Sequence, residues 1–482
     1  MAEVMFCLSS EVNFFAKRST LFKMLTSDLF NTLLDKVKSF LHSENLTGYL
    51  VGGTVRDFIL GKFPADIDLV VIGDVSSADK LAAFLDVVLV KFAHPTVVRL
   101  VLPFKEYQIY IDVEYTTEGD ILDNLGRRDF TINAMALPLR SGDLNFGKVI
   151  DPYRGRDDIE KKTIRAVNPQ VFKEDAVRIL RAFRLASGLD FFIEDKTLNL
   201  LCMEAVKVDW GKIAGERIWK ELRMILGFED SLKTLLYMQE KSCVLDKLFG
   251  NRNLEDNAEV NTWSDKFVRL KFLEEFWKGS LTADIFDNIR SLYEKTTAEF
   301  VEDITPAIKL AVLLDNFASS ERRNVKKAKE VCDFLRMPGW EKDIVLTVVK
   351  GYSEVSKIYK NNLRDLSAKR RFVNKYNKYT PILLIFSLAD FAADNDNIDG
   401  EVFDYACYVE DFLQFYLKEG REWFRLPRYI NGDKVMEILG VRPSSKVGNI
   451  LRMVVEKEIT GQITNEKEAQ DFVKFLKDSK YP

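Results

Sequence analysis

Two aspartates separated by a single residue are the side chains most suited to chemistry. Asp66 and Asp68 open a run rich in Val and Ile, ADIDLVVI. In a β-strand, residues i and i+2 point to the same face of the sheet, so both carboxylates are expected to project together. Adjacent carboxylates repel each other unless a cation lies between them, and oxygen ligands suit Mg²⁺. A bare Asp-x-Asp pair is also typical of two solvated acids at a strand end, so the neighbouring residues must decide.

The residues before this pair have the pattern of a phosphate-binding turn. Gly52 and Gly53 follow a short apolar run and begin a segment with helical character that carries Arg56. Glycine lets backbone N–H groups approach a phosphate closely, and the start of a helix adds a favourable dipole. A strand, a glycine turn, a helix and then paired acids predict a site for a nucleoside triphosphate and two Mg²⁺ ions. Such a site can activate a hydroxyl and stabilise a leaving pyrophosphate.

A third carboxylate is expected from the run YIDVEY. Asp112 and Glu114 are again two residues apart, and either is a candidate to deprotonate the attacking hydroxyl. Alternation places Ile111 and Val113 on the opposite face and favours Asp112, with Glu114 as the alternative.

The elements that must position these acids change character along the chain. Residues 28–44 have the pattern of an amphipathic helix, and five short β-rich runs follow between Tyr49 and Tyr115, with a helical segment before and after the second run. After Asp151 helical periodicity dominates. We therefore expect an α+β protein, with a mixed-sheet head followed by an all-α neck, body and tail. The expected domains are 28–150, 151–226, 227–350 and 351–482, and the polar segment 251–261 is a plausible boundary.

Composition narrows the class of protein. The chain has 482 residues, a formal net charge of −4, five scattered cysteines and two histidines. These numbers argue against a disulfide framework, a structural zinc site and general coating of nucleic acid. No stretch approaches the ~20 apolar residues that span a bilayer. We expect a cytoplasmic protein without membrane contact, and the sequence leaves open its oligomeric state and the role of residues 1–27.

Four blocks occur in a fixed order: GGTVRDFILGKFPADIDLVV, RRDFTINAMA, DPYRGRDDI and EDAVRILRAFRLA. In this combination the chain resembles the class II tRNA nucleotidyltransferases and bacterial poly(A) polymerases, within the polymerase β-like superfamily. The resemblance is close from residue 49 to about 226, where Glu216 to Leu222 resemble the E-R-I-x-x-E-L of the neck, and weaker at 430–475. It implies an enzyme that extends the 3′ end of tRNA without a nucleic-acid template, using CTP and, for a full CCA end, ATP.

The resemblance also implies residue roles. Asp66 and Asp68 would hold the metal ions, and the triphosphate would be held by Gly52, Gly53 and Arg56. Arg128, Asp129 and Asn133 match the ribose-reading motif of the family, although a helix cap explains the same residues. Asp151 matches a motif at the head–neck junction together with Gly155 and Asp158, and a turn at a helix start is the alternative there.

The base would be read by residues of the fourth block, Glu174, Asp175 and Arg178. Asp175 and Arg178 are three residues apart on an expected helix, so their side chains can lie side by side. A carboxylate acceptor beside a guanidinium donor matches the donor and acceptor edges of cytosine and adenine and mismatches uracil and guanine. The alternative is an intrahelical salt bridge.

The segment after the third-carboxylate strand is short. Only residues 113–126 separate Asp112 from Arg127, and Thr116 and Thr117 stand where the family usually has an Arg. This shortening resembles the CC-adding enzymes, so CMP addition that stops at CC is favoured. Full CCA addition is the first alternative, followed by A addition or a poly(A) polymerase. A non-catalytic tRNA-binding protein is the rival from another class.

Two segments are candidates to contact tRNA lacking a complete CCA end. Residues 357–378 are strongly basic with interleaved aromatics, and from them we select Lys369, Arg370, Arg371 and Lys375. Residues 443–448 open a helix expected near Val447, where Ser444, Ser445 and Lys446 are candidates for a tRNA phosphate. The alternatives are a solvated helix face and a helix cap without a ligand.

Overall fold

The computed structural model describes most of the chain. The described residues are 27–64, 66–92, 94–104, 107–116, 121–139, 146–249, 263–315, 321–361, 366–395, 398–420 and 429–479. Residues 1–26 and the boundary expected at 251–261 lie outside them. The chain divides into two compact units, one ending at Ile213 and including Tyr237–Lys247, the other formed by Ala214–Leu236 and the residues from Leu248 onwards. The finer four-domain division stays a prediction.

The first unit contains a mixed sheet, as the sequence predicts, and this sheet has six strands rather than the five expected. Its strands lie in the order β3-β4-β5-β2-β1-β6. β2 and β5 are parallel, and every other neighbouring pair is antiparallel. The strands are β1 (Thr47–Val51), β2 (Ile67–Ile72), β3 (Val88–Lys91), β4 (Val97–Phe104), β5 (Tyr107–Thr116) and β6 (Ala136–Leu139). The parallel pair at the centre brings Asp68 and Asp112 together.

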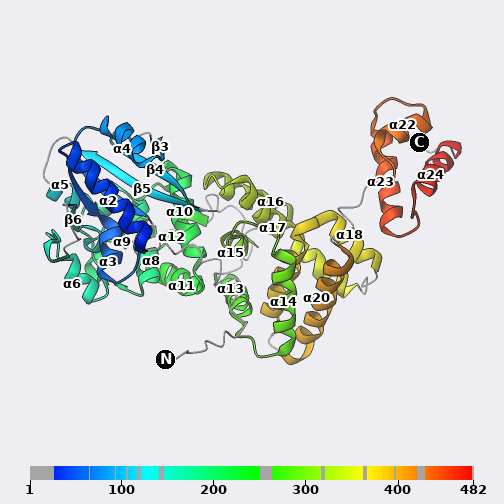
Figure 1. The fold of residues 1–482 in the computed structure, drawn as a ribbon. Helices are drawn as coiled ribbons and strands as arrows, with labels where there is room; N and C mark the ends of the chain where they lie inside the picture. The colour runs from blue at the N-terminus through cyan, green and yellow to red at the C-terminus, as the bar shows by residue number, and fades with distance from the viewer. Residues whose placement is uncertain are drawn as a thin grey trace, which may run out of the picture. The chain divides into compact units, whose positions relative to one another are not determined.

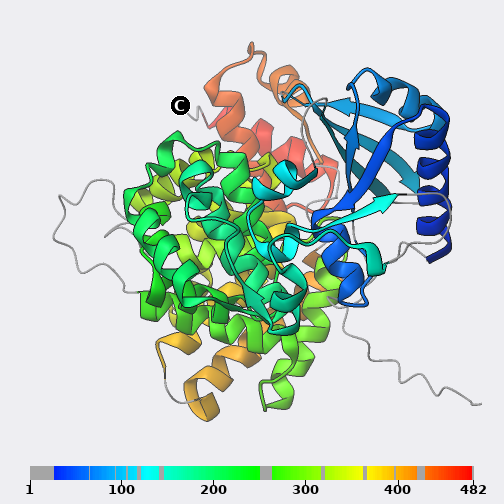
Figure 2. The same ribbon diagram turned by 90° about the vertical axis from the view of Figure 1, so that its left-hand side faces the viewer.

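Helices cover one face of this sheet. Figures 1 and 2 show α2 (Ser27–Ser43) lying along the strands, and α4 (Ser77–Leu85) packs beside it. Alternate strand residues such as Leu69, Leu100 and Ile111 are fully or almost fully buried on this face. Because side chains alternate, the residues between them, including both site acids on strands, point to the opposite face.

On the opposite face a smaller cluster covers only one end of the sheet. α3 (Gly52–Ile59), α5 (Ile121–Gly126) and the 3-10 turn η1 (Thr131–Asn133) lie at the β2-β1-β6 end. Val51, Val70 and Leu125 belong to the buried core there. This packing fixes the glycine turn and the RRDFTINAMA segment next to the central strands.

The rest of the first unit consists of helices and two very short strands. These elements are η2 (Phe146–Lys148), α6 (Gly155–Glu160), β7 (Thr163–Ile164), α7 (Val171–Glu174), α8 (Val177–Leu189), β8 (Phe192–Ile193), α9 (Asp195–Lys207) and η3 (Trp210–Lys212). β7 and β8 pair in parallel, a feature that the expected all-α neck does not include.

The described elements of the second unit are helical. They are α10 (Gly215–Leu226), the first part of α11 (Ser231–Lys241), the end of α12 (Val244–Phe249), α13 (Trp263–Lys278), α14 (Asp284–Thr297), α15 (Thr305–Leu314), α16 (Glu321–Phe334), α17 (Gly339–Lys360), α18 (Leu366–Tyr376), η4 (Asn377–Tyr379), α19 (Thr380–Ala393), η5 (Ile398–Val402), α20 (Phe403–Phe415), η6 (Tyr416–Gly420), α22 (Gly432–Leu439), α23 (Ser445–Ile459) and α24 (Glu466–Asp478). The last three helices pack around their own apolar core, which includes Val435, Ile450 and Val473. None of the described helices has the length and apolarity that crossing a bilayer requires.

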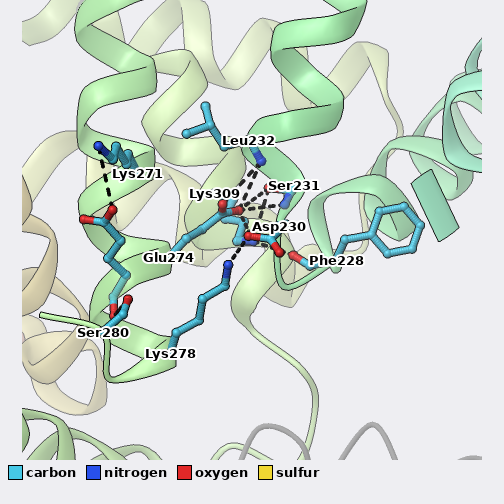
Figure 3. A network of polar contacts seen from close by, with 10 residues as sticks. Phe228, Asp230, Ser231, Leu232, Lys271, Glu274, Lys278, Ser280 and Lys309 are labelled. Carbon is cyan, nitrogen blue, oxygen red and sulfur yellow. Dashed lines mark hydrogen bonds and ion pairs between the residues drawn. The ribbon is translucent and has the colours of Figure 1, made fainter. Parts of the chain in front are cut away.

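A buried ion pair joins three helices of the second unit (Figure 3). Lys309 on α15 lies 2.6 Å from Glu274 on α13, and both side chains are almost fully buried. Glu274 also accepts hydrogen bonds from the Ser231 backbone N–H and hydroxyl, at 2.9 and 2.7 Å. Lys309 donates to the Phe228 carbonyl at 2.7 Å. Because each charge has several polar partners, the pair fixes the start of α11 without leaving a buried charge unpaired.

A second buried network lies between α13, α15, α17 and α19. Arg269 contacts Asp315 at 2.5 Å and Asp390 at 3.2 Å. Burial raises the pKa of Asp390 to about 7 against the attraction of Arg269, and Asp315 raises it further. Lys266 donates to two backbone carbonyls, and burial lowers its pKa to about 7. These groups therefore couple the stability of the fold to pH.

Candidate active site

The two predicted metal-binding acids sit at the start of the central strand β2. The strand begins at Ile67, so Asp66 is exposed immediately before it, while Asp68 lies on the strand and is half-buried. The hydroxyl of Thr54 on α3 accepts a hydrogen bond from the Asp68 N–H at 2.8 Å. The same hydroxyl donates to the Asp66 carbonyl at 3.2 Å. A single side chain therefore fixes both acids relative to α3.

The glycine turn lies directly against Asp68. Gly52 has a φ of +64°, a left-handed conformation that favours glycine. A Cβ atom at Gly52 would lie 2.7 Å from Nη1 of Arg128 and 3.0 Å from Oδ2 of Asp68, and a Cβ at Gly53 would lie 3.6 Å from the same oxygen. The structure thus brings together the turn, Asp68 and the guanidinium of Arg128, and leaves no room for a side chain at Gly52.

Asp112 is the strand partner of Asp68. In the parallel pairing of β2 with β5, Asp68 is aligned with Asp112, whereas Glu114 is aligned with Val70. Ile111 and Val113 are fully buried on the other face, as the alternation predicts. Of the two candidates for the third carboxylate, Asp112 is therefore the one beside Asp68.

Arg99 is a site residue that the sequence reasoning missed. It is aligned with Asp112 in the antiparallel pair β4–β5. Its Nε and Nη2 donate to the two carboxylate oxygens of Asp112, each at 2.7 Å. These hydrogen bonds raise the pKa of Arg99 against the opposing effect of burial. The sequence contained a signal for Arg99, because it is the one charged residue in the apolar run TVVRLVL. Alternation along the strand places its side chain on the same face of the sheet as Asp112.

The charge around Asp68 fits a divalent cation. Burial raises the pKa of Asp68, and the nearby Asp112 and Asp66 raise it too, although Arg128 acts in the opposite direction. Among the described residues, no three His, Cys, Asp or Glu side chains already surround a common point. Mg²⁺ commonly takes only one or two carboxylates and completes its shell with substrate phosphates and water. Asp66 and Asp68 match that donor set.

The predicted ribose-reading residues form a chain of hydrogen bonds. Asp129 is buried and accepts from the Phe130 N–H at 2.8 Å and from the Asn133 amide at 3.0 Å. The Asn133 oxygen in turn accepts from Nη1 of Arg56 at 2.8 Å. Arg128 is half-buried and donates to the Asn124 side chain at 3.2 and 3.1 Å. Arg56, Asn133 and Asp129 therefore form one connected network, and Arg128 is held separately by Asn124.

A second residue missed by the sequence reasoning completes this network. Nε of Arg181 on α8 lies 2.5 Å from Oδ2 of Asp129. Burial would raise the pKa of Asp129, but Arg181 and the amide donors hold it below its usual value. The signal in the sequence was the spacing of Arg178, Arg181 and Arg184, because residues three apart share one face of a helix.

The DPYRGRDDI block packs against η1, which carries Asn133. Both carboxylate oxygens of Asp151 accept backbone N–H groups at the start of α6, at 2.7 and 3.0 Å. A Cβ at Gly155 would lie 2.3 Å from the Thr131 carbonyl, so α6 packs directly on η1. Asp158 accepts from the Thr131 hydroxyl at 2.6 Å. These interactions position η1, and a direct role of Asp151 in nucleotide binding stays a prediction.

The expected helix over the base-reading residues is interrupted. α7 ends at Glu174 and α8 begins at Val177, so Asp175 lies in the break, with extended backbone at φ −152°. Its Oδ1 accepts from the Val177 N–H at 3.2 Å. Arg178 donates to Glu174 at 3.2 Å and to the Arg127 carbonyl at 2.7 Å. The expectation that Asp175 and Arg178 share one helix is therefore wrong, because Asp175 lies two residues before the start of α8 and accepts from the N–H of its first residue.

The four basic residues selected for tRNA contact have acidic neighbours within the second unit. Lys369 is almost fully buried and pairs with Asp411, and Lys375 lies 2.5 Å from Glu354. Arg370 is 3.8 Å from Glu419, and Arg371 pairs with Glu456. Contact between these four side chains and tRNA stays a prediction.

The second candidate segment for tRNA contact lies at the start of α23. The helix begins at Ser445, close to the expected start near Val447. Ser444 and Ser445 are exposed there, and Lys446 is half-buried. Phosphate binding by these residues stays a prediction.

Comparisons with known proteins agree with this geometry. Residues 48–165 match the family described as Poly A polymerase head domain. The A-adding tRNA nucleotidyltransferase of Halalkalibacterium halodurans is 29% identical over 274 residues, which cover 52% of this chain and 64% of that protein. The chain thus spans just under two thirds of that relative. The multifunctional CCA protein of Cupriavidus metallidurans is 29% identical over 331 residues, which cover 64% of this chain and 75% of that protein.

A solved structure extends the similarity to nearly the whole chain. The Thermotoga maritima CCA-adding enzyme, determined in complex with tRNA, aligns with a TM-score of 0.57 and 24% identity and covers 94% of this chain and 97% of that one. At this identity the likeness concerns the fold. With the matched head family, the related sequences and the ordered motifs around Asp68, residues 48–165 match the Poly A polymerase head domain, and the chain is similar to the class II tRNA nucleotidyltransferases and bacterial poly(A) polymerases.

Proposed function

We propose that this protein transfers CMP from CTP to the 3′ end of tRNAs that lack a complete CCA end, without a nucleic-acid template. The observation that carries the proposal is the position of Asp68, aligned with Asp112 on one side and in contact distance of the Gly52 turn on the other. Acids for metal ions beside a turn for phosphates are what nucleotidyl transfer requires. The relative named as an A-adding tRNA nucleotidyltransferase supports tRNA as the acceptor.

Different residues of the site would bind the metal ions, bind the triphosphate and accept the proton during CMP transfer. Two Mg²⁺ ions held by Asp66 and Asp68 would favour ionisation of the attacking 3′-hydroxyl and neutralise charge on the phosphates. The N–H groups of Gly52 and Gly53 would bind the triphosphate together with Arg56. Asp112 would accept the proton of the 3′-hydroxyl, with its orientation set by the two hydrogen bonds from Arg99.

Ribose and base would be read by separate groups. The buried Asp129, held by Asn133 and Arg181, is the expected acceptor near the ribose hydroxyls. Asp175 and Arg178 would read the base, the carboxylate accepting from the exocyclic amine and the guanidinium donating to the ring nitrogen. For this, Arg178 must exchange its hydrogen bond to Glu174 for one to the base.

A short loop favours CC as the product. β5 ends at Thr116 and α5 begins at Ile121, so only residues 117–120, which lie outside the described part of the chain, separate them. The longer loop of CCA-adding enzymes is considered the element that re-forms the pocket for ATP. Full CCA addition is the alternative, followed by A addition or poly(A) synthesis.

One assay separates these products. Transcripts of one tRNA ending at the discriminator base, at C or at CC are incubated with Mg²⁺ and with each NTP singly or all four together, and the ends are sequenced. CC ends in the presence of all four NTPs are expected. CCA ends would show that the short loop does not prevent A addition, and extension of only the CC transcript by ATP would indicate an A-adding enzyme.

Matched variants tie the activity to the site. Asp68→Asn is expected to reduce incorporation at least ~10³-fold, since metal clamps of this kind contribute several kcal/mol to the transition state. Asp86→Asn, at an exposed acid at the end of α4, should keep full activity. A wild-type protein that incorporates no nucleotide into any transcript would overturn the enzymatic proposal and leave a non-catalytic tRNA-binding protein.

A further inference from the structure

The sheet face that carries the acids continues open towards the edge strand β3. The pairing of four neighbouring strands aligns Asp68, Asp112, Arg99 and Val90 in one row across this face. The described helices α2 and α4 cover the other face. At the β3 end of the row, Val88 is 62% exposed and Val90 is 38% exposed. Neighbouring exposed apolar residues that form a continuous patch are typical of an interaction surface.

Two aromatic rings flank Arg99 at this end. Its guanidinium carbon lies 4.7 Å from the centroid of Tyr110 and 5.6 Å from that of Phe92. Phe92 is 43% exposed and follows β3 directly. Aromatic rings and guanidinium planes are the groups on which unpaired nucleic-acid bases stack, in a way that tolerates any base. The chemistry of this surface therefore fits single-stranded RNA.

The direction of the reaction points to the same surface. Gly52 and Gly53, which would hold the triphosphate, lie beside Asp68 on the side of β1. In nucleotidyl transfer the attacking oxygen and the leaving pyrophosphate are roughly in line, on opposite sides of the reacting phosphorus. The hydroxyl must then approach from the side away from β1, which is the side of β5, β4 and β3.

We propose that Phe92, Arg99 and Tyr110 bind the single-stranded 3′ end of the acceptor RNA. The terminal bases stack on the two rings, and Arg99 holds Asp112 where the 3′-hydroxyl arrives. This inference rests on the proposed nucleotidyl transfer and names the surface that presents its acceptor. Arg99 has two roles in this proposal. It is part of the RNA-binding surface, and it is a positioning residue because it acts on the reaction through Asp112.

Binding without turnover tests the surface first. The probe is a fluorescent acceptor-stem minihelix with a single-stranded 3′ end in C, titrated by anisotropy with no nucleotide present. Phe92→Ala and Tyr110→Ala are each expected to weaken binding about tenfold. The matched control is Phe84→Ala, because Phe84 is 49% exposed but packs against Phe40 in the helix layer. Tyr110→Phe keeps the ring and should bind like wild type.

Steady-state kinetics give a second, independent measure. Both alanine variants should raise KM for tRNA about tenfold and leave KM for CTP within twofold, since the nucleotide residues lie on the other side of Asp68. Unchanged binding and unchanged KM for tRNA in folded variants would overturn the inference while leaving nucleotidyl transfer intact. An equal loss in Phe84→Ala would overturn it as well.

Crosslinking of the wild type avoids dependence on variants. A minihelix with 4-thiouridine as its last residue should crosslink to peptides of β3 to β5, whether or not CMP is incorporated. Crosslinks confined to other peptides would overturn the inference. Light scattering measures the oligomeric state of the wild type and of Phe92→Ala. A wild-type dimer that becomes a monomer in this variant, with RNA binding unchanged, would show that a second copy of the chain occupies this face and would overturn the inference.

Discussion

Arg99 and Asp112 face each other on adjacent antiparallel strands and share two hydrogen bonds of 2.7 Å each. A bidentate pair of this kind fixes the plane of the carboxylate as well as its position. The carboxylate proposed to accept the proton is therefore oriented before any substrate arrives.

Replacing Arg99 by Leu should separate orientation from charge. Loss of the guanidinium adds one net negative charge beside Asp68, so Mn²⁺, used as a spectroscopic substitute for Mg²⁺, should bind more tightly. The rate of transfer should nevertheless fall about 10- to 100-fold, because Asp112 is no longer held. Electron paramagnetic resonance measures the Mn²⁺ affinity, and single-turnover kinetics measure the rate. Arg127→Leu makes the same charge change at a 69% exposed side chain 3.7 Å from Glu114. It should alter both quantities little, and equal effects in the two variants would contradict this account.

Asp175→Ala should lower the selectivity for CTP over UTP. Without the carboxylate that accepts from the amine of cytosine, selectivity for CTP over UTP is expected to fall at least about tenfold while transfer continues. Competition between labelled CTP and UTP measures the ratio. The control is Asp190→Ala, at an exposed acid at the other end of α8. Selectivity that stays at the wild-type value in Asp175→Ala would refute base reading by this residue.

Gly155→Ala should destabilise the first unit. The added methyl group would lie 2.3 Å from the Thr131 carbonyl and 3.0 Å from the Met135 sulfur, so α6 or η1 must move. Overpacking of this kind costs about 1–3 kcal/mol. Thermal unfolding measures the change, and CTP binding should weaken because η1 carries Asn133. Gly448→Ala, in a helix where the methyl meets nothing within 4 Å, should not destabilise the protein.

Glu274→Ala should destabilise the second unit more than any exposed substitution. It leaves the ammonium group of Lys309 buried without its carboxylate, which typically costs about 3–5 kcal/mol. Glu275→Ala, on the same helix, removes only an exposed pair with Lys271 at 3.8 Å and should cost less than about 1 kcal/mol. Urea unfolding gives both values. Similar values for the two variants would show that the buried pair contributes little.

Asp390 should make stability fall as pH rises from 4 to 7. Its folded-state pKa of about 7 lies above the ordinary value of 3.8, so in this window the folded protein binds more protons than the unfolded chain. The free energy of unfolding should decrease by up to about 4 kcal/mol across it. Lys266 acts in the opposite sense but only above pH 7, between its folded pKa of about 7 and 10.5. Asp390→Asn should flatten the profile between pH 4 and 7, whereas Asp433→Asn, at an exposed acid of α22, should not.

The sequence predicted the elements of the head well because their signals are local. The helix expected at 28–44 is observed at Ser27–Ser43. The expectation that both acids lie on one strand holds for Asp68 only, because β2 begins at Ile67 and Asp66 precedes it. β6 was not predicted, because a four-residue strand containing Pro138 is recognised only through its pairing with β1. β7 and β8, with two residues each, depend on the same kind of partner.

The residues of the candidate site show the same difference between local and long-range signals. Asp66, Asp68 and the glycine turn were predicted because a few neighbouring residues carry the pattern. Arg99 and Arg181 were not, because each acts through a carboxylate that strand pairing or helix packing brings to it from a distance. The break at Asp175 was hidden by the continuous helical periodicity of its block.

The hydroxyl of Thr54 links the glycine-turn helix to the backbone on both sides of Ile67. The glycine turn proposed to bind phosphate and the acid pair are therefore held in a fixed relative position by the hydrogen bonds of a single oxygen atom. Anyone grafting this chemistry onto another scaffold would have to transplant residues 47–72 as a block, since either half moved by itself arrives without its reference point.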